Sequence, residues 1–127
     1  MHEASAKLQK QITSYGEFSA ERYGTRFFMY KYREKIVVDN EPTTAEVDIV
    51  RVLDNCIELI EVKRSDVIDE NQARWILNKD VHNRIQEIVG MKDIVTKVYY
   101  LGRPTIYNGV QYENITDVLL SDYKLKI

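Results

Sequence analysis

The chain has 127 residues, with 18 lysines and arginines against 20 aspartates and glutamates, for a formal net charge of −2. This length predicts one domain over residues 1–127, large enough for a real hydrophobic core but too small for a second core. A single cysteine excludes an internal disulfide, and one cysteine with two histidines excludes a conventional zinc site.

Apolar and aromatic residues recur at roughly helical spacing through the N-terminal third of the chain. They are Leu8, Ile12, Tyr15, Phe18, Tyr23, Phe27 and Tyr30. The spacing predicts helix over this third, with breaks or kinks at Gly16 and Gly24. A strand over residues 36–38 and a loop over residues 39–43 are expected to follow.

Two runs rich in β-forming residues, 47–53 and 56–62, flank Asp54-Asn55, a pair typical of a tight hairpin turn. The two runs are therefore expected to pair antiparallel, with Leu53 opposite Cys56. This register matches apolar with apolar side chains, and a slip by one residue would turn every side chain to the wrong face. The partners are then Val52 with Ile57, Arg51 with Glu58, Val50 with Leu59, Ile49 with Ile60, Asp48 with Glu61, and Glu46 with Lys63.

The predicted hairpin places Asp48, Glu61 and Lys63 on one face, because side chains on one face of a strand recur every second residue. Directly opposed Cβ atoms lie roughly 5 Å apart. Two carboxylates at that separation repel each other, and a cation between them removes the repulsion. Mg²⁺ or Mn²⁺ suits such a pair, since Mg²⁺ takes a few carboxylate oxygens and keeps several waters. The Lys63 ammonium could hold a water or steady a phosphate beside the metal, as phosphodiester hydrolysis requires.

At these residues the chain resembles the PD-(D/E)xK nuclease superfamily, whose core motif is an acid on one strand of a hairpin and Glu-x-Lys on the next. Asp48 matches the first acid, and Glu61-Val62-Lys63 matches the second part. Val47 stands where many members have proline. The resemblance implies metal-dependent cleavage of nucleic acid, with Asp48 and Glu61 as metal ligands, the carbonyl of Val62 as a further ligand, and Lys63 beside the attacking water.

The same resemblance implies a restriction-endonuclease-like fold and a possible further acidic residue. Many members take another ligand from the first helix, which makes Glu21 the candidate, with Glu17 one turn behind it as the alternative. Branched-DNA resolvases are closest in size to this chain, and they act as dimers because two strands must be cut. Branched DNA is thus one implied substrate, and a homodimer one implied assembly.

A long helix is predicted from a cap at Asp69 or Asn71 to a stop at Gly90. Its apolar stripe is expected to pack on the sheet and comprises Ala73, Leu77, Val81, Ile85 and Ile88. On its more polar side, Trp75 could stack on a base, or form the edge of the core, and Lys79 could contact backbone phosphate. Other candidate phosphate contacts are basic clusters at Lys31, Arg33 and Lys35, at Lys63 and Arg64, and at Arg74, Lys79 and Arg84.

A strand over residues 95–101, a tight turn over 107–110 and a closing helix over 115–120 complete the expected order. The predicted fold class is α/β or α+β, with a central mixed sheet that contains the antiparallel hairpin and is flanked by helices. The chain has no signal-like N-terminus and no apolar run near the roughly 18 residues of a membrane span, so we expect a soluble cytoplasmic protein with no membrane partner.

Three interpretations of the acidic pair follow from the sequence. The first is a nuclease that uses Mg²⁺ or Mn²⁺ and acts on DNA. The second is a nuclease-derived protein without catalysis that binds nucleic acid or serves in assembly. The third is a surface network of salt bridges, Glu46 with Lys63 and Asp48 with Lys63, at a sheet edge.

Overall fold

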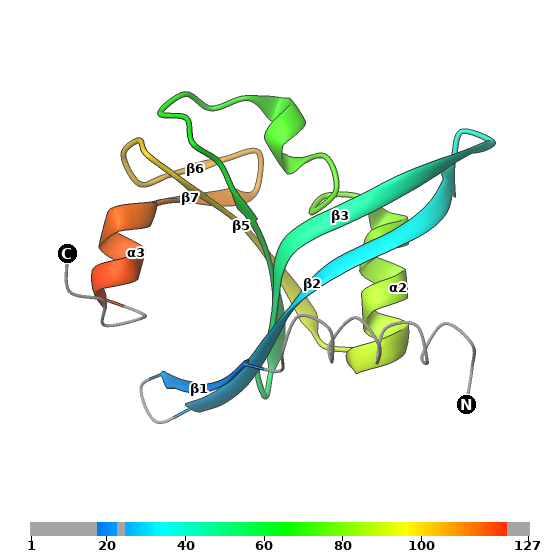
Figure 1. Ribbon diagram of the computed structural model, residues 1–127, viewed down its shortest axis with the longest axis horizontal. Helices are drawn as coiled ribbons and strands as arrows, with labels where there is room; N and C mark the ends of the chain where they lie inside the picture. Colours follow the sequence, from blue (N-terminus) through cyan, green and yellow to red (C-terminus); the bar gives the residue numbers. More distant parts are fainter. Residues whose placement is uncertain (1–17, 23–24, 122–127) are drawn as a thin grey trace.

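The computed structural model describes residues 18–22 and 25–121 (Figure 1). Four strands come first along the described part of the chain, before any helix. The elements are β1 (Phe18–Arg22), β2 (Thr25–Val38), β3 (Glu41–Val52), β4 (Cys56–Val62), the 3₁₀ helix η1 (Glu70–Ala73), α2 (Lys79–Val89), β5 (Asp93–Tyr100), β6 (Thr105–Tyr107), β7 (Val110–Asn114) and α3 (Ile115–Ser121).

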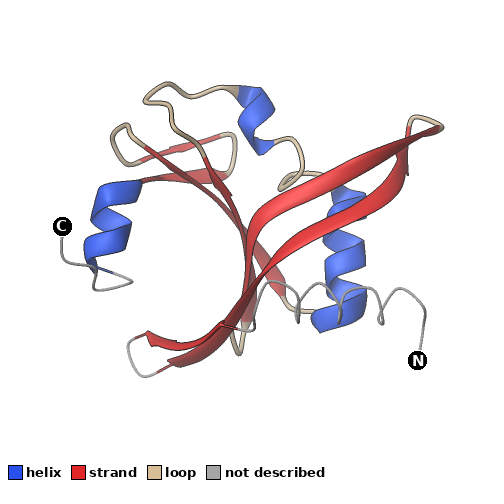
Figure 2. Ribbon diagram, in the orientation of Figure 1, coloured by secondary structure: helices blue, strands red, loops and turns tan. Residues whose placement is uncertain are grey.

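The strands form one mixed, seven-stranded sheet in the order β1-β2-β3-β4-β5-β7-β6 (Figure 2). Strands β1 to β4 pair antiparallel with one another. After the crossover through α2, β5 lies parallel to β4, and β7 lies parallel to β5. The short edge strand β6 closes an antiparallel hairpin with β7. The fold is therefore α+β, and the predicted mixed sheet with an antiparallel hairpin is confirmed.

The predicted helix of the N-terminal third is wrong, because β1 and β2 occupy residues 18–22 and 25–38. Side-chain burial alternates along β2 with a period of two residues. Tyr30 and Tyr32 are buried, whereas Arg33, which points to the other face, is exposed. This alternation of aromatic and charged residues is a strand pattern and overrides the helical spacing. Residues 8–17, including Glu17, lie outside the described part of the chain.

The predicted strand at 36–38 is the end of β2, and the predicted loop over 39–43 is shorter than expected. Only Asp39 and Asn40 form the turn, with φ of 52° and 65°. Aspartate and asparagine tolerate this left-handed conformation, which a two-residue hairpin turn requires at both positions. The β2–β3 hairpin therefore runs to the tip of a long arm that projects from the sheet (Figure 1).

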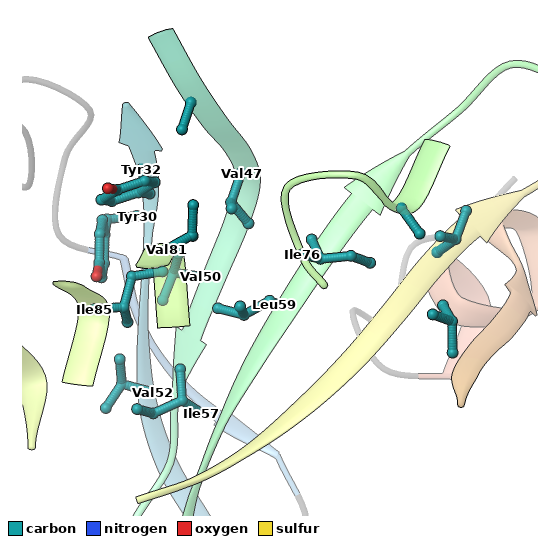
Figure 3. Close-up of a cluster of buried hydrophobic side chains, with 14 of the residues drawn as sticks. Tyr30, Tyr32, Val47, Val50, Val52, Ile57, Leu59, Ile76, Val81 and Ile85 are labelled. Atoms are coloured by element: carbon teal, nitrogen blue, oxygen red, sulfur yellow. The ribbon is translucent and has the colours of Figure 1, made fainter. Parts of the chain in front are cut away.

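The main core lies between α2 and one face of the sheet, and Figure 3 shows its tyrosine and aliphatic side chains. An ion pair adds to this packing, because Arg84 of α2 contacts Glu34 of β2 at 2.6 Å. The fully buried members of the core are Tyr32, Ala45, Val47, Val50, Ile57, Leu59, Ile76, Val81, Ile85 and Val98.

The single long helix predicted after the hairpin is divided in two. Asp69 caps η1 through a capping box with Gln72, as the first of the two predicted caps, but the helix ends after one turn. Asn78, in an extended conformation, then caps α2 by accepting from two N–H groups. In the break between the two helices Ile76 is buried and the predicted Leu77 is 37% exposed, whereas Ala73, Val81 and Ile85 are buried as predicted. Gly90 ends α2 with a φ of 117°, as predicted.

The C-terminal predictions are confirmed. β5 covers most of the expected strand, Asn108 and Gly109 form the expected turn with positive φ, and α3 is the closing helix. Among the residues that the structure describes, no helix is both long and apolar enough to cross a bilayer.

The second face of the sheet buries a network of charges beside the smaller apolar cluster of Ile60, Tyr99 and Val118. Glu58 contacts the fully buried guanidinium of Arg51 and lies 2.6 Å from the ammonium of Lys97. Although burial raises the pKa of Glu58, its hydrogen bonds to Arg51 and Lys97 outweigh that effect and lower it. The predicted cross-strand pair of Arg51 and Glu58 is therefore a fully buried ion pair.

Candidate metal centre at the fork between β3 and β4

The β3–β4 hairpin has the predicted register over its first part. Val52 pairs with Ile57, Arg51 with Glu58, Val50 with Leu59 and Ile49 with Ile60, and the turn is closed by a bond of 2.9 Å from Leu53 N–H to the Cys56 carbonyl. The ladder then ends. The last two predicted pairs, Asp48 with Glu61 and Glu46 with Lys63, are therefore wrong.

The ladder ends because β3 contains a β-bulge at the residues next to the acidic pair. Tyr30 of β2 pairs with Val50, but Tyr32 pairs with Val47, so that Asp48 and Ile49 together face one residue of β2. The extra residue reverses the alternation of β3, which is why Val47 and Val50 both enter the main core. A bulge also bends its strand and re-aims a side chain.

Beyond the bulge the two strands form a fork. β3 leaves with β2 as the projecting arm, whereas β4 continues beside β5 to the pair Val62–Tyr99 (Figure 1). Asp48 bridges the opening, because its Oδ2 accepts a hydrogen bond of 2.9 Å from the backbone N–H of Val62. The side chain thus takes the place of a ladder bond and is fixed at the base of the fork. This bond leaves the second carboxylate oxygen for another partner.

Glu61 meets Asp48 at the base of the fork. It is only 7% exposed, since it shares its face of β4 with the fully buried Ile57 and Leu59. Its Oε1 is buried and has no hydrogen-bond partner among the described residues. Burial first, and then the charge and close contact of the Asp48 carboxyl, raise the pKa of Glu61 to about 8. Without a cation, this carboxyl therefore keeps its proton at neutral pH.

Lys63 follows on the same face of β4, and its Nζ lies 3.9 Å from Oε2 of Glu61. Its charge lowers the pKa of Glu61, but less than burial and Asp48 raise it. The Lys63 side chain is 38% exposed, so its ammonium stands between the buried carboxyl and solvent. Its backbone N–H donates to the Tyr99 carbonyl, which holds this end of β4 against β5.

The Val62 carbonyl faces the fork. In an extended strand the N–H and C=O of one residue point to the same neighbouring strand. Because the Val62 N–H points to Asp48, its carbonyl points to the same side, into the fork where β3 no longer pairs.

These groups fit a divalent cation. Oε1 of Glu61 is a buried oxygen without a hydrogen-bond partner among the described residues, and a cation would offset both the burial of this carboxyl and the charge of Asp48, which together raise its pKa. Within the described ranges no three Asp, Glu, His or Cys side chains converge as a ligand group. The donors present are two carboxylates and one carbonyl, which are oxygen ligands of the kind that Mg²⁺ or Mn²⁺ takes, with waters in the other positions.

The acidic pair lies in a groove of about 520 Å³. One wall is the arm, with Arg33, Thr44 and Glu46, and the other wall is the segment around η1. Arg33 pairs with Glu46 at 3.0 Å. The predicted alternative of a network joining Glu46 and Asp48 to Lys63 is not seen among the described residues. The groove is lined by Arg33, Thr44, Glu46, Asp48, Glu61, Lys63, Asn71, Gln72, Arg74 and Trp75.

The η1 wall is the part of the site that sequence reasoning missed. Trp75 was expected on a continuous helix, where it could stack on a base or form the edge of the core. It packs against the core, and the guanidinium of Arg74 lies 4.4 Å above its ring. The sequence signal for a break in the helix was the Asp69-x-x-Gln72 capping pattern, which is followed within one short segment by a second capping residue, Asn78.

The structure brings Asp48, Glu61, Val62, Lys63 and Trp75 together, and separates other predicted residues from them. Arg64 and Lys79 are exposed and do not line the groove.

Glu21 lies on the edge strand β1, opposite Arg26, and not on a helix. Its proposed role as a ligand from a first helix therefore loses its structural premise.

A scan against protein-family models and searches of curated proteins and of solved structures found no match.

Proposed function

We propose that the chain is a nuclease that depends on Mg²⁺ or Mn²⁺ and hydrolyses phosphodiester bonds, with DNA as the expected substrate. One observation carries the proposal: two carboxyls converge at an open fork, where one is buried, has an orphaned oxygen and has a pKa raised to about 8. A purely structural salt bridge would lower this pKa, whereas a site prepared for a metal ion raises it in the metal's absence.

The neighbouring groups support the same chemistry. Asp48, Glu61 and the Val62 carbonyl would hold the cation, which when bound supplies positive charge at the phosphate and a water of lowered pKa. Lys63, partly exposed beside Glu61, can donate a hydrogen bond to the attacking water or to a phosphate oxygen. Arg33 and Arg74 line the groove and can bind flanking phosphates. Water attacks phosphorus, the P–O bond to the leaving oxygen breaks, and a proton passes to that oxygen.

This proposal includes membership of the PD-(D/E)xK superfamily and a restriction-endonuclease-like core. The support is the acid on β3, the Glu-x-Lys on β4, and the antiparallel hairpin continued by the parallel strand β5 after a helix. Branched DNA as substrate and a homodimer as assembly belong to the proposal as implied by the resemblance. The cytoplasmic location remains a prediction from the sequence.

Metal binding is expected to raise the melting temperature. Mn²⁺ at millimolar concentration and pH 7 should stabilise the protein, because a ligand that binds only the folded state shifts unfolding by mass action. A tenfold excess of free metal over its Kd corresponds to about 1.4 kcal/mol. With Mg²⁺ the effect should grow from pH 6 to pH 8.5, since the metal must displace the proton that Glu61 holds below its pKa of about 8. Differential scanning fluorimetry measures both.

Asp48→Asn tests whether the fork is the site of that effect, with Asp80→Asn on α2 as the matched control. The first substitution should remove the metal-induced shift, and the second should leave it unchanged. An equal shift in all three proteins would contradict the proposal. No shift at all would favour the non-catalytic interpretation, in which Glu61 stays protonated.

A further inference from the structure

Resting on the nuclease function proposed above, we propose that the groove admits one nucleic-acid strand at a time, and that Arg74, whose guanidinium lies over the Trp75 ring, binds a phosphate of that strand. The acidic pair lies at the bottom of the groove, and Arg74 lies on the wall across from the β2–β3 arm.

Arg74 is held in place by its neighbours along the chain. Ala73 before it and Ile76 after it are buried in the main core. The Arg74 N–H donates to the Asn71 carbonyl and closes η1, whose first turn is fixed by the Asp69 capping box. The guanidinium carbon lies over the half-buried indole, 4.4 Å from the ring centroid. Since its position is set before any ligand arrives, little conformational entropy is lost on binding.

The charge of Arg74 calls for an anionic ligand. The other two cations of the groove have carboxylate neighbours, Arg33 with Glu46 and Lys63 with Glu61. Arg74 forms no ion pair with any residue that the structure describes, and its side chain is exposed. Stacking on an indole uses the flat face of a guanidinium and leaves its N–H edge to bind a phosphate with two hydrogen bonds.

The shape of the groove favours a single strand over a duplex. Glu61 is 7% exposed, so a phosphodiester must descend between the arm and the η1 wall to reach it. A cavity of about 520 Å³ is a small-ligand size and holds a nucleotide or two. A duplex carries two strands, and its major groove alone is about 12 Å wide, so a cavity with room for a nucleotide or two does not enclose it. An unpaired strand, a flap or a frayed end can bend into such a groove.

Binding is measured without metal, in the full chain carrying Glu61→Gln, by fluorescence anisotropy of a labelled single-stranded DNA 12-mer over a range of salt concentrations. The comparison ligand is a hairpin duplex of the same sequence. Trp75 is the only tryptophan of the chain, so its intrinsic fluorescence reports directly on occupation of the groove. The single strand should bind at least tenfold more tightly than the duplex and should change the Trp75 emission.

Adding Arg74→Ala should weaken single-strand binding about tenfold and reduce the salt slope by about 0.7, the value for one lost phosphate contact. Trp75→Leu, which keeps the arginine but removes its support, should act in the same direction. Arg103→Ala, an exposed arginine away from the groove, is the matched control and should change neither quantity. Melting temperatures of all variants establish that they fold.

Duplex binding as tight as single-strand binding, or an Arg74→Ala variant that behaves like Arg103→Ala, would overturn this inference. Because no metal is present, that outcome is distinct from failure of the nuclease proposal. If the protein with Glu61 intact cleaves DNA, and Arg74→Ala does not change single-strand binding, only the role of Arg74 is refuted. A protein that binds a strand through Arg74 but neither binds metal nor cleaves refutes only the nuclease.

Discussion

Replacement of Glu61 by glutamine should lower metal-dependent cleavage of nucleic acid by roughly 10³-fold, the size of effect seen when one charge-stabilising group is removed from an active site. Glutamine keeps the shape of the side chain but cannot supply the negative charge that a divalent cation requires. Lys63→Ala should cost about 10²–10³-fold by the same reasoning. The assay offers duplex, single-stranded, flap and four-way-junction DNA, and RNA, with Mg²⁺ or Mn²⁺, and follows product on denaturing gels.

The control for these variants is Glu87→Gln, which removes a carboxylate from an exposed ion pair with Arg84 on α2. It should cleave like the unmodified protein. Equal cleavage by the Glu61→Gln and Glu87→Gln proteins would show that the nuclease activity arises at a site other than the fork. The folded state of Glu61→Gln should survive, because the glutamine side chain is neutral, as the protonated Glu61 carboxyl is at neutral pH, and has nearly the same shape.

Glu58→Ala is expected to lower the free energy of unfolding by about 3–5 kcal/mol, the usual cost of removing one partner of a buried ion pair. Arg51 and Lys97 are both buried and both contact this carboxylate, so its loss leaves two cations beside each other on the sheet. Urea unfolding measures the change. Glu87→Gln serves again as control, since an exposed ion pair contributes at most about 1 kcal/mol.

The double variant Glu58→Leu with Lys97→Met distinguishes the loss of charge balance from the loss of packing. It should be more stable than Glu58→Ala, because apolar replacements of similar volume also remove the Lys97 ammonium, which otherwise lies beside Arg51 without the Glu58 charge. A Glu58→Ala protein within about 1 kcal/mol of the original would contradict the account of the buried network.

The hairpin could be predicted from sequence because its register follows from local information. The Asp54-Asn55 turn, the opposite charges of Arg51 and Glu58, and the apolar pairs around them all favour one alignment. That alignment also identified Asp48, Glu61 and Lys63 as neighbours. The fork between the strands could not be predicted, since a bulge at Asp48 depends on how β2 pairs with β3 from the other side.

The two largest errors also arise from long-range contacts. The aromatic residues up to Tyr30 have helical spacing, but Phe18 and Phe27 lie in the β1–β2 hairpin, and Tyr30 and Tyr32 of β2 pair with Val50 and Val47 of β3. These strand pairings override the helical spacing. The second groove wall required knowing that the chain stops after Ala73 and restarts at Asn78. Only this break turns Arg74 and Trp75 toward the acidic pair.

Asp48 and Glu61 are proposed to share a divalent cation, and NMR titration of the Glu61 carboxyl carbon measures this sharing at the site itself. Without metal, the carboxyl should titrate with a pKa of about 8. The apo fold should accordingly lose stability as pH rises from the ordinary carboxyl pKa of 4.5 to about 8 and change little above that, since only over this range does the folded state hold a proton that the unfolded state has lost. Saturating Mg²⁺ should move the titration well below neutral pH. A carboxyl that titrates near its ordinary value and ignores Mg²⁺ would contradict the account.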